Sequence, residues 1–305
     1  MKETRNSKSE TREESPEASS DIRVSSFLSS PSSIARGKSS IYSTAVGRLH
    51  VEEVGTGLPI VLWPSLFCDA SQWRHQVDEF ARDHRLLLVD GPGHGGSEAP
   101  RSPFTLEECA RATVEILDHA GIDRAVLAGL SWGGMTSMRV ALQAPKRVAA
   151  LVLIDTSADA ERRLEKIRIR GLELLFHRLG FLGVIEGAVI KALVGRTTRR
   201  ERPEVGADLA ARFRAWDAEG LARAVRAVIL DRPSILHDLS GIECPTLVIV
   251  GEEDEATPPP CSERIARRIP GARVARIPRA GHLSALESPM EVNRAIRSFL
   301  AEIGC

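Results

Sequence analysis

Residues 125–134 read Ala-Val-Leu-Ala-Gly-Leu-Ser-Trp-Gly-Gly. The apolar run at the start predicts a buried strand, and the residues that follow, 132–144, predict a helix. A Gly-x-Ser-x-Gly pattern at this junction places Ser131 on a sharp turn with a strained backbone. The chain packs closely on both sides of such a turn, so only very small residues fit at Gly129 and Gly133. The pattern therefore predicts Ser131 as a nucleophile raised above the end of a sheet.

A base and a carboxylate are needed to make a serine hydroxyl nucleophilic. For this type of turn the expected chain order is serine, then acid, then histidine. His282, in Ala-Gly-His-Leu at 280–283, is the only histidine after the acidic loop 252–255, so it is the expected base. Asp254 in that loop is the expected acid. The alternatives that the pattern leaves open are Glu252, Glu253, Glu255 and Asp155.

Two backbone N–H groups are expected to stabilise the oxyanion that forms when the serine attacks. Trp132 would supply one at the start of its helix, where the helix dipole also favours negative charge. The second should come from the loop after the apolar run 59–63. Pro64 has no N–H, so Leu66 is the predicted donor, with Phe67 next. The side chains expected to line the substrate pocket are Phe67, His94 and Trp216.

A glycine-rich loop at 90–97, Asp-Gly-Pro-Gly-His-Gly-Gly-Ser, contains a literal Gly-x-Gly-x-x-Gly after a strand. A dinucleotide site would need a helix that begins at the third glycine and faces the pyrophosphate. Here Pro100 and Pro103 follow, and the next helix is predicted from Thr105. The loop therefore predicts a tight turn, and no nucleotide cofactor is expected.

Short apolar runs alternate with helical patterns along the rest of the chain, which predicts a mainly parallel α/β sheet covered by helices on both faces. After a leading antiparallel pair at 41–46 and 48–54, the predicted strands are 59–63, 86–89, 125–128, 149–154, 246–250 and 274–277. The predicted helices are 71–82, 105–120, 132–144, 260–269 and 289–302. Thr105 and Glu108 form a capping-box pattern at the start of the second helix.

Three regions of different character divide the chain. Residues 1–40 are rich in serine and poor in apolar residues, which predicts a disordered tail. Residues 41–157 and 241–305 carry the strand–helix alternation and predict the core. Residues 158–240 contain no convincing strand but do contain amphipathic stretches, at 162–175 and 209–230, which predict a helical insertion. Long insertions at strand ends commonly form a lid over a substrate pocket.

Composition narrows the classes of function. The 305 residues carry 41 basic and 41 acidic side chains, which argues against nucleic-acid binding. No uninterrupted apolar run is long enough to span a membrane. Five widely spaced cysteines without a Cys-x-x-Cys pair predict reduced thiols, no structural metal and a cytoplasmic protein. We expect a small-molecule substrate, no cofactor, and a monomer or homodimer.

The motifs taken together resemble the α/β-hydrolase family across residues 41–302. The landmarks, in order, are the loops 90–97 and 129–134, Gly-Glu-Glu-Asp-Glu-Ala-Thr-Pro at 251–258, and Gly281-His282 followed by Glu287 and Pro289. The resemblance implies an eight-stranded sheet and a Ser131–Asp254–His282 triad beneath a helical cap. Within the family the chain is most similar to the 3-oxoadipate enol-lactonase-like group. It departs from that group at Pro64-Ser65 and at Phe67, where a bulky ring would reshape the pocket.

The leading functional prediction is a serine hydrolase that cleaves a small carboxylic ester or lactone through an acyl-enzyme. Two alternatives remain open. The same triad could hydrolyse a carbon–carbon bond or carry out cofactor-free perhydrolysis. The chain could also be a non-catalytic relative that binds a small molecule without turnover.

Overall fold

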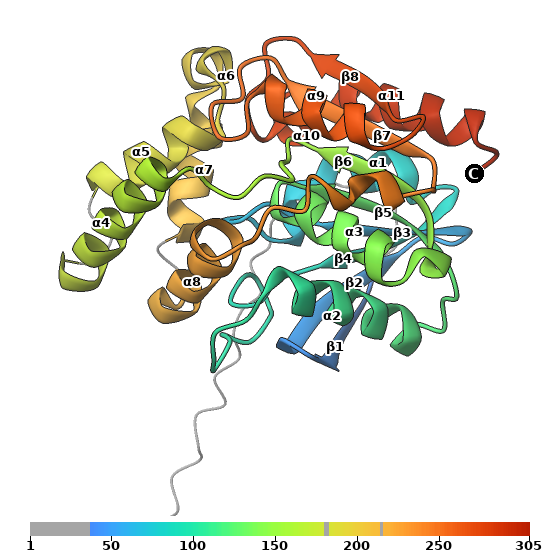
Figure 1. The fold of residues 1–305 in the computed structure, drawn as a ribbon, viewed down its shortest axis with the longest axis horizontal. Helices are drawn as coiled ribbons and strands as arrows, with labels where there is room; N and C mark the ends of the chain where they lie inside the picture. Colours follow the sequence, from blue (N-terminus) through green and yellow to red (C-terminus); the bar gives the residue numbers. More distant parts are fainter. Residues whose placement is uncertain (1–36, 180–182, 214–215) are drawn as a thin grey trace, which may run out of the picture.

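The computed structural model describes residues 37–179, 183–213 and 216–305, and an eight-stranded sheet runs through this part of the chain (Figure 1). The strand order is β1-β2-β4-β3-β5-β6-β7-β8. The strands are β1 Lys38–Thr44, β2 Gly47–Val54, β3 Leu58–Trp63, β4 His84–Val89, β5 Ala125–Leu130, β6 Val148–Ile154, β7 Thr246–Gly251 and β8 Arg273–Ile277. The β1–β2 and β2–β4 pairs are antiparallel and the other pairs are parallel. The predicted mainly parallel α/β sheet is therefore confirmed.

Helices cover both faces of this sheet, because the central strands are apolar on both faces. In β5, Ala125 and Leu127 face one hydrophobic core, whereas Val126 and Ala128 face the other. The first core is closed by α2 (Leu106–His119), α3 (Trp132–Gln143) and α9 (Pro259–Arg268). The second is closed by α1 (Arg74–Phe80), α10 (Ser284–Glu287) and α11 (Pro289–Glu302). Continuous apolar runs of this kind are typical of parallel strands buried on both faces.

The start of α2 shows how local sequence sets a helix boundary. The Thr105 hydroxyl accepts a hydrogen bond from the Glu108 N–H at 3.2 Å, and the Glu108 carboxylate accepts from the Thr105 N–H at 2.9 Å. This reciprocal pair satisfies two N–H groups that the helix itself leaves unpaired. The capping box that the sequence predicts is therefore present.

The segment between β6 and β7 is helical and lies to one side of the sheet (Figure 1). Its helices are α4 (Arg163–Leu179), α5 (Gly183–Leu193), α6 (Arg196–Glu201), α7 (Pro203–Phe213) and α8 (Ala218–Val225), followed by a π-helical turn at Arg226–Leu230. The prediction of one amphipathic helix over 209–230 is wrong. The Asp217 carboxylate accepts from the Gly220 N–H at 2.6 Å and so starts a new helix, α8.

The predicted boundary between the tail and the core, at residue 40, also differs from the structure. Strand β1 begins at Lys38 and pairs with β2, so residues 38–40, which the sequence assigns to the tail, belong to the sheet. Of the rest of the predicted tail, Gly37 is described and residues 1–36 lie outside the described residues.

Hydrogen bonds to buried or half-buried carboxylates attach the helical insertion (residues 158–240) to the core. The Glu287 carboxylate accepts from the Gly195 N–H at 2.9 Å, next to the start of α6. Glu253, in the loop after β7, accepts from the Thr197 N–H at 2.8 Å. On the other side, the Arg212 guanidinium of α7 lies 2.9 Å from the Asp69 carboxylate. These contacts place the insertion over the carboxyl ends of the strands.

Two glycines at the β5–α3 turn have no room for a side chain. A Cβ on Gly129 would lie 2.1 Å from the Gly133 carbonyl carbon, and one on Gly133 would lie 2.0 Å from the Trp63 carbonyl oxygen. Both neighbours are backbone atoms, so a rotamer change cannot relieve either clash. The turn is therefore packed directly against β3.

We expect Gly129→Ala and Gly133→Ala each to lower the free energy of unfolding by about 2–4 kcal/mol, because the backbone must shift to admit the methyl group. Gly187→Ala is the matched control, since its Cβ would meet nothing within 4 Å in the middle of α5. It should leave stability unchanged or raise it by up to about 1 kcal/mol. Thermal and denaturant unfolding provide the measurement. Equal stability of all three variants would contradict the packing described here.

Candidate active site

Ser131 lies at the turn between β5 and α3 with φ of 51° and ψ of −105°, a left-handed conformation that is strained for a residue with a side chain. Two hydrogen bonds hold it there. Its N–H donates to the Ile154 carbonyl at 2.8 Å, and the Thr156 hydroxyl donates to its carbonyl at 2.7 Å. The residue is 6% exposed. Strand β6 and the residues just after it therefore fix the backbone of Ser131. Its side chain is the nucleophile that the sequence predicts.

The structure brings His282 and Asp254 together from two neighbouring loops. Nδ1 of His282 lies 2.9 Å from Oδ2 and 3.0 Å from Oδ1 of Asp254, and both side chains are buried. Asp254 follows β7 and His282 follows β8, so parallel pairing of these strands sets both loops at one edge of the sheet. Because Nδ1 faces the carboxylate, Nε2 is the nitrogen left for a substrate or nucleophile.

Burial and charge act in opposite directions on this pair. Burial alone would raise the pKa of Asp254, but the His282 imidazole and hydrogen bonds from His282 and Thr257 hold this pKa below its ordinary value. Burial alone would lower the pKa of His282, but the Asp254 carboxylate outweighs it and raises the pKa. The pair therefore favours a carboxylate beside an imidazole that binds protons readily.

Two of the alternative acids named from the sequence, Asp155 and Glu253, have other partners. Asp155, fully buried, accepts from the Gly251 N–H at 2.8 Å and the Ser284 N–H at 3.0 Å. Burial and the nearby Asp254 raise the pKa of Asp155 well above its ordinary value. Glu253 holds the insertion at Thr197. Of these carboxylates, the one within hydrogen-bond distance of His282 in the described structure is Asp254.

Two residues that support the pair were not assigned a role from the sequence. The Thr257 hydroxyl donates to Asp254 Oδ2 at 2.9 Å and lies 3.2 Å from His282 Nδ1. The Glu287 carboxylate accepts from the Leu283 N–H at 3.1 Å and so holds the His282 loop. A threonine three residues after the acid is a weak sequence signal, and in the sequence Glu287 stands out only as part of a family landmark.

The loop after β3 is held by His94. Phe67 has a φ of 65°, and its N–H donates to His94 Nε2 at 3.2 Å. The other ring nitrogen, Nδ1, donates to the Pro92 carbonyl at 3.0 Å. Burial lowers the pKa of His94, which keeps Nε2 free of a proton and able to accept. Within the described residues, the N–H groups of Leu66 and Trp132 have no protein acceptor.

Of the three side chains predicted to line the pocket, the structure places one there. Phe67 lines the cavity described below, whereas His94 and Trp216 are absent from its described lining. His94 is fully buried beneath the loop after β3, with its ring centroid 5.4 Å from that of Trp132 and 4.7 Å from that of Trp216. The glycine turns at 90–97 direct His94 inward, so its role as a pocket residue is corrected to one of support.

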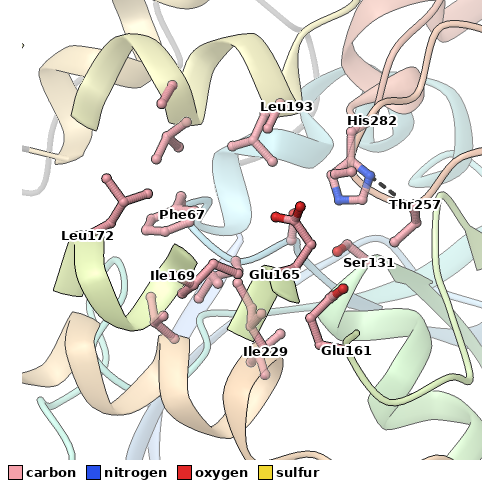
Figure 2. Close-up of a pocket in the computed structure, with 18 of the residues that line it drawn as sticks. Phe67, Ser131, Glu161, Glu165, Ile169, Leu172, Leu193, Ile229, Thr257 and His282 are labelled. Atoms are coloured by element: carbon pink, nitrogen blue, oxygen red, sulfur yellow. Dashed lines mark hydrogen bonds between the residues drawn. The ribbon is translucent and has the colours of Figure 1, made fainter. Parts of the chain in front are cut away.

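A cavity of about 420 Å³ opens beside Ser131 and His282 (Figure 2). The core supplies Leu66, Phe67, Ser131, Thr257 and His282 to its wall, and α4, α5 and α8 of the insertion supply most of the rest. Figure 2 shows Leu172, Ile169, Leu193 and Ile229 around the apolar part. A nucleophile and a base that share a mostly apolar cavity can act on the carbonyl group of an organic substrate.

The chain also matches known proteins. The family model described as the alpha/beta hydrolase family matches residues 60–295. The chain belongs to the alpha/beta hydrolase family. The structure of a thermophilic esterase from Thermogutta terrifontis is 32% identical, with a TM-score of 0.81, over 88% of this chain and all of that one. The enol-lactonase from Burkholderia xenovorans LB400 is 28% identical, with a TM-score of 0.79, over 86% of this chain and 100% of that one.

A curated hydrolase extends the range of related activities. A 2-hydroxy-6-oxononadienedioate/2-hydroxy-6-oxononatrienedioate hydrolase from Burkholderia vietnamiensis is 29% identical over 83% of this chain and 91% of that protein. The resemblance to the family that the sequence motifs indicate is confirmed. Family membership and these neighbours support hydrolase activity for this member.

Three further features of the described part of the chain concern metal binding, helix length and thiols. Among the described residues, no three His, Cys, Asp or Glu side chains form a group that could hold a metal ion. None of the helices described there is both long and apolar enough to cross a membrane. Burial raises the pKa of the Cys68 thiol, so this cysteine near the cavity is held in its unreactive thiol form.

We expect His94→Phe to lower kcat for hydrolysis about tenfold or more with little change in KM, because the loop that carries Leu66 loses its acceptor. His94→Gln, whose amide oxygen can accept from the Phe67 N–H, should recover part of the loss. Steady-state kinetics of both variants, with unfolding measured in parallel, provide the test. A normal kcat in His94→Phe, with lowered stability alone, would show that the loop needs no such support.

Proposed function

We propose that this alpha/beta hydrolase cleaves a small carboxylic ester or lactone through an acyl-enzyme on Ser131. The observation that carries the proposal is the buried His282–Asp254 pair, with Nδ1 2.9 Å from the carboxylate, opening on the same cavity as Ser131. Ser131, Asp254 and His282 follow one another along the chain in the order serine, acid, histidine, which is the order expected for a nucleophile on this type of turn.

In the first step, Oγ of Ser131 attacks the substrate carbonyl carbon while His282 Nε2 takes the hydroxyl proton. The Asp254 carboxylate holds the ring by its Nδ1–H and stabilises the imidazolium that forms. Negative charge moves to the carbonyl oxygen of the tetrahedral intermediate. The N–H groups of Trp132 and Leu66, which have no acceptor among the described residues, are the proposed donors to it.

In the second step, the intermediate expels its alkoxy group, which takes the proton from His282 and leaves as an alcohol. Water then attacks the acyl-enzyme, with His282 again accepting a proton, and the acid is released with Ser131 regenerated. For a lactone, the alcohol and acid remain in one molecule. The helical insertion acts as the cap, since its apolar side chains complete the cavity.

The comparisons also support a second reaction class, the hydrolysis of a carbon–carbon bond. The Burkholderia vietnamiensis relative is named for hydrolysis of an oxo-dioate, so carbon–carbon cleavage by the same triad is the second candidate. Analysis of the products separates it from ester hydrolysis, because a ketone fragment replaces the alcohol. Tight binding of substrate with no product by any route would instead favour a non-catalytic binding protein.

Labelling with a fluorophosphonate tests the nucleophile, and the chain supplies a matched control. Ser39 Oγ lies 2.8 Å from His50 Nε2, and His50 Nδ1 lies 2.9 Å from Asp90 Oδ2, but Ser39 is exposed on β1 outside the described cavity lining. We expect Ser131→Ala to abolish labelling and lower the hydrolysis of p-nitrophenyl butyrate by about 10³-fold or more. Ser39→Ala should retain both. Labelling of another serine, or full activity in Ser131→Ala, would overturn the proposal.

The pH profile tests the base. Only neutral His282 can accept a proton, and its raised pKa means that activity is lost as the pH falls through a value above the ordinary 6.5. We expect Asp254→Asn to move the acid limb of kcat/KM to lower pH and to reduce kcat by about 10⁴-fold. Glu252→Gln, in the same loop, should leave the profile unchanged. An unshifted limb in Asp254→Asn would assign the orienting role to another carboxylate.

A further inference from the structure

Charged side chains of the insertion line the cavity beside the reacting groups. In Figure 2 the carboxylates of Glu161 and Glu165 reach into the cavity on the side of Ser131 and His282, whereas Leu172 lies farther away. The described charged lining consists of the carboxylates of Glu161, Glu165, Glu173 and Glu255 and the guanidinium groups of Arg168 and Arg232. Glu173 and Glu255 have guanidinium partners just outside the lining, Arg226 at 3.6 Å and Arg199 at 3.8 Å. Glu161 and Glu165 are therefore the carboxylates that decide the charge close to where substrate must bind.

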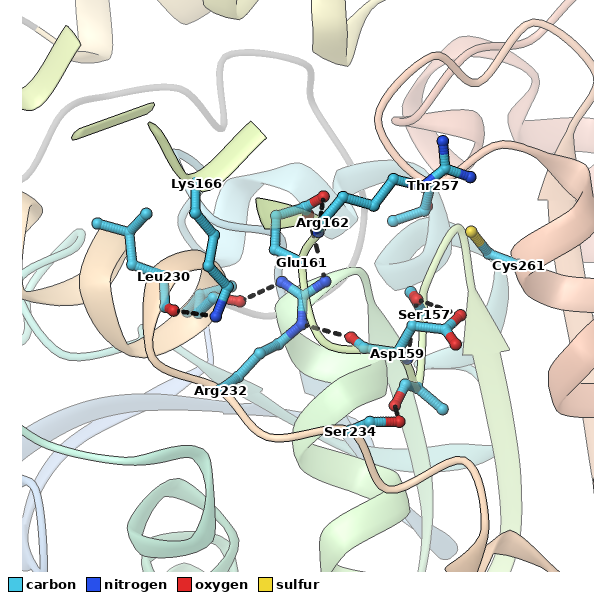
Figure 3. A network of polar contacts seen from close by, with 12 residues as sticks. Ser157, Asp159, Glu161, Arg162, Lys166, Leu230, Arg232, Ser234, Thr257 and Cys261 are labelled. Carbon is cyan, nitrogen blue, oxygen red and sulfur yellow. Dashed lines mark hydrogen bonds and ion pairs between the residues drawn. The ribbon is translucent and has the colours of Figure 1, made fainter. Parts of the chain in front are cut away.

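Arg232 is the buried cation of this lining, and protein groups already hold it (Figure 3). Its Nε donates to the Asp159 carbonyl at 3.0 Å, and its Nη1 donates to the Val228 carbonyl. Its Nη2 lies 3.5 Å from Glu161 Oε2, and the Arg232 side chain is 6% exposed. A substrate carboxylate would have to compete with Glu161 for a guanidinium that is fixed by two backbone carbonyls.

Arg168 carries the other guanidinium group of the lining, and it too is a weak binding partner for a substrate carboxylate. It lies 3.4 Å from the Glu165 carboxylate on the same helix, and 67% of its side chain is exposed to water. The Glu165 side chain is less exposed, at 43%, so solvent screens the guanidinium more strongly than the carboxylate. Both cations of the described lining are therefore paired with glutamates that also face the cavity.

We propose that the cavity selects substrates by charge: it accepts esters or lactones whose non-reacting part is apolar and neutral, or carries an ammonium group, and excludes those that carry a carboxylate. This inference rests on the proposed function. A carboxylate entering the cavity loses hydration, finds no free cation in the described lining and is repelled by Glu161 and Glu165. An ammonium group meets the same carboxylates with favourable sign, and the apolar wall accepts the rest of the molecule.

Matched pairs of esters test the charge preference. We expect kcat/KM for p-nitrophenyl pentanoate to exceed that for mono-p-nitrophenyl glutarate, which has the same chain length and a terminal carboxylate, by about 30-fold. Butyrylcholine should be hydrolysed faster than its neutral isostere 3,3-dimethylbutyl butyrate. Glu165→Gln and Glu161→Gln should each reduce both ratios about fivefold by acting on the charged ester, and raised salt should narrow them.

Controls separate this inference from the proposed function. Glu204→Gln, at an exposed residue of α7 outside the described cavity lining, should leave both ratios unchanged. Calorimetry with Ser131→Ala measures binding of butyrylcholine and mono-p-nitrophenyl glutarate without turnover, and we expect the cationic ester to bind more tightly. Hydrolysis that depends on Ser131 with equal rates for neutral and anionic esters would overturn the charge preference alone. Equal or tighter binding of the anionic ester would overturn it even where no ester is turned over.

Discussion

The packing of the β5–α3 turn against β3 is the constraint on which the rest of the site depends. A Cβ at Gly133 would lie 2.0 Å from the Trp63 carbonyl oxygen, so the start of α3 touches the backbone of the neighbouring strand. This contact fixes the Trp132 N–H and the Ser131 side chain relative to the loop that follows β3. The proposed nucleophile and the Trp132 N–H therefore share one rigid frame, and the His94 side chain holds the loop that carries the second proposed donor, Leu66.

Buried charge around His282 forms a second frame. Asp254 and Asp155 are both buried near the imidazole, and the pKa of one is lowered while that of the other is raised. The His282 ring and the Thr257 hydrogen bonds lower the pKa of Asp254. Burial and the neighbouring Asp254 carboxylate raise the pKa of Asp155, although it accepts hydrogen bonds from the Gly251 and Ser284 N–H groups. The two neighbouring carboxylates therefore have different contacts. Asp254 faces the His282 ring, whereas Asp155 accepts from an N–H at the end of β7 and from one just after His282.

Sequence patterns predicted most of the core, because the signals there are local. The apolar run at 125–130, the glycines around Ser131 and the Thr105–Glu108 capping box each depend on a few neighbouring residues. Chain order was also enough to name His282 and Asp254, which the structure places in contact. The order of loops along parallel strands translates directly into positions along one sheet edge.

The predictions failed where side-chain direction or distant contacts decide the outcome. His94 was expected in the pocket, but its side chain lies beneath Phe67 in the structure. A loop has no hydrophobic periodicity from which the direction of a side chain could be predicted. The helix predicted over 209–230 was divided by the Asp217 cap. The cavity glutamates escaped notice because charged residues on an amphipathic helix look the same in sequence whether they face solvent or a cavity.

The anchorage of the insertion has a consequence for how such an enzyme can diversify. Glu287 accepts from the Gly195 N–H at the start of α6 and from the Leu283 N–H beside His282, so α6 and the His282 loop are held by a single carboxylate. Helices α4 and α5 come before this contact in the chain. They supply both charged and apolar residues to the cavity wall, such as Glu165 and Leu172. Helices α4 and α5 can therefore be exchanged during evolution to bind new molecules. The positions of α6 and the His282 loop do not depend on them.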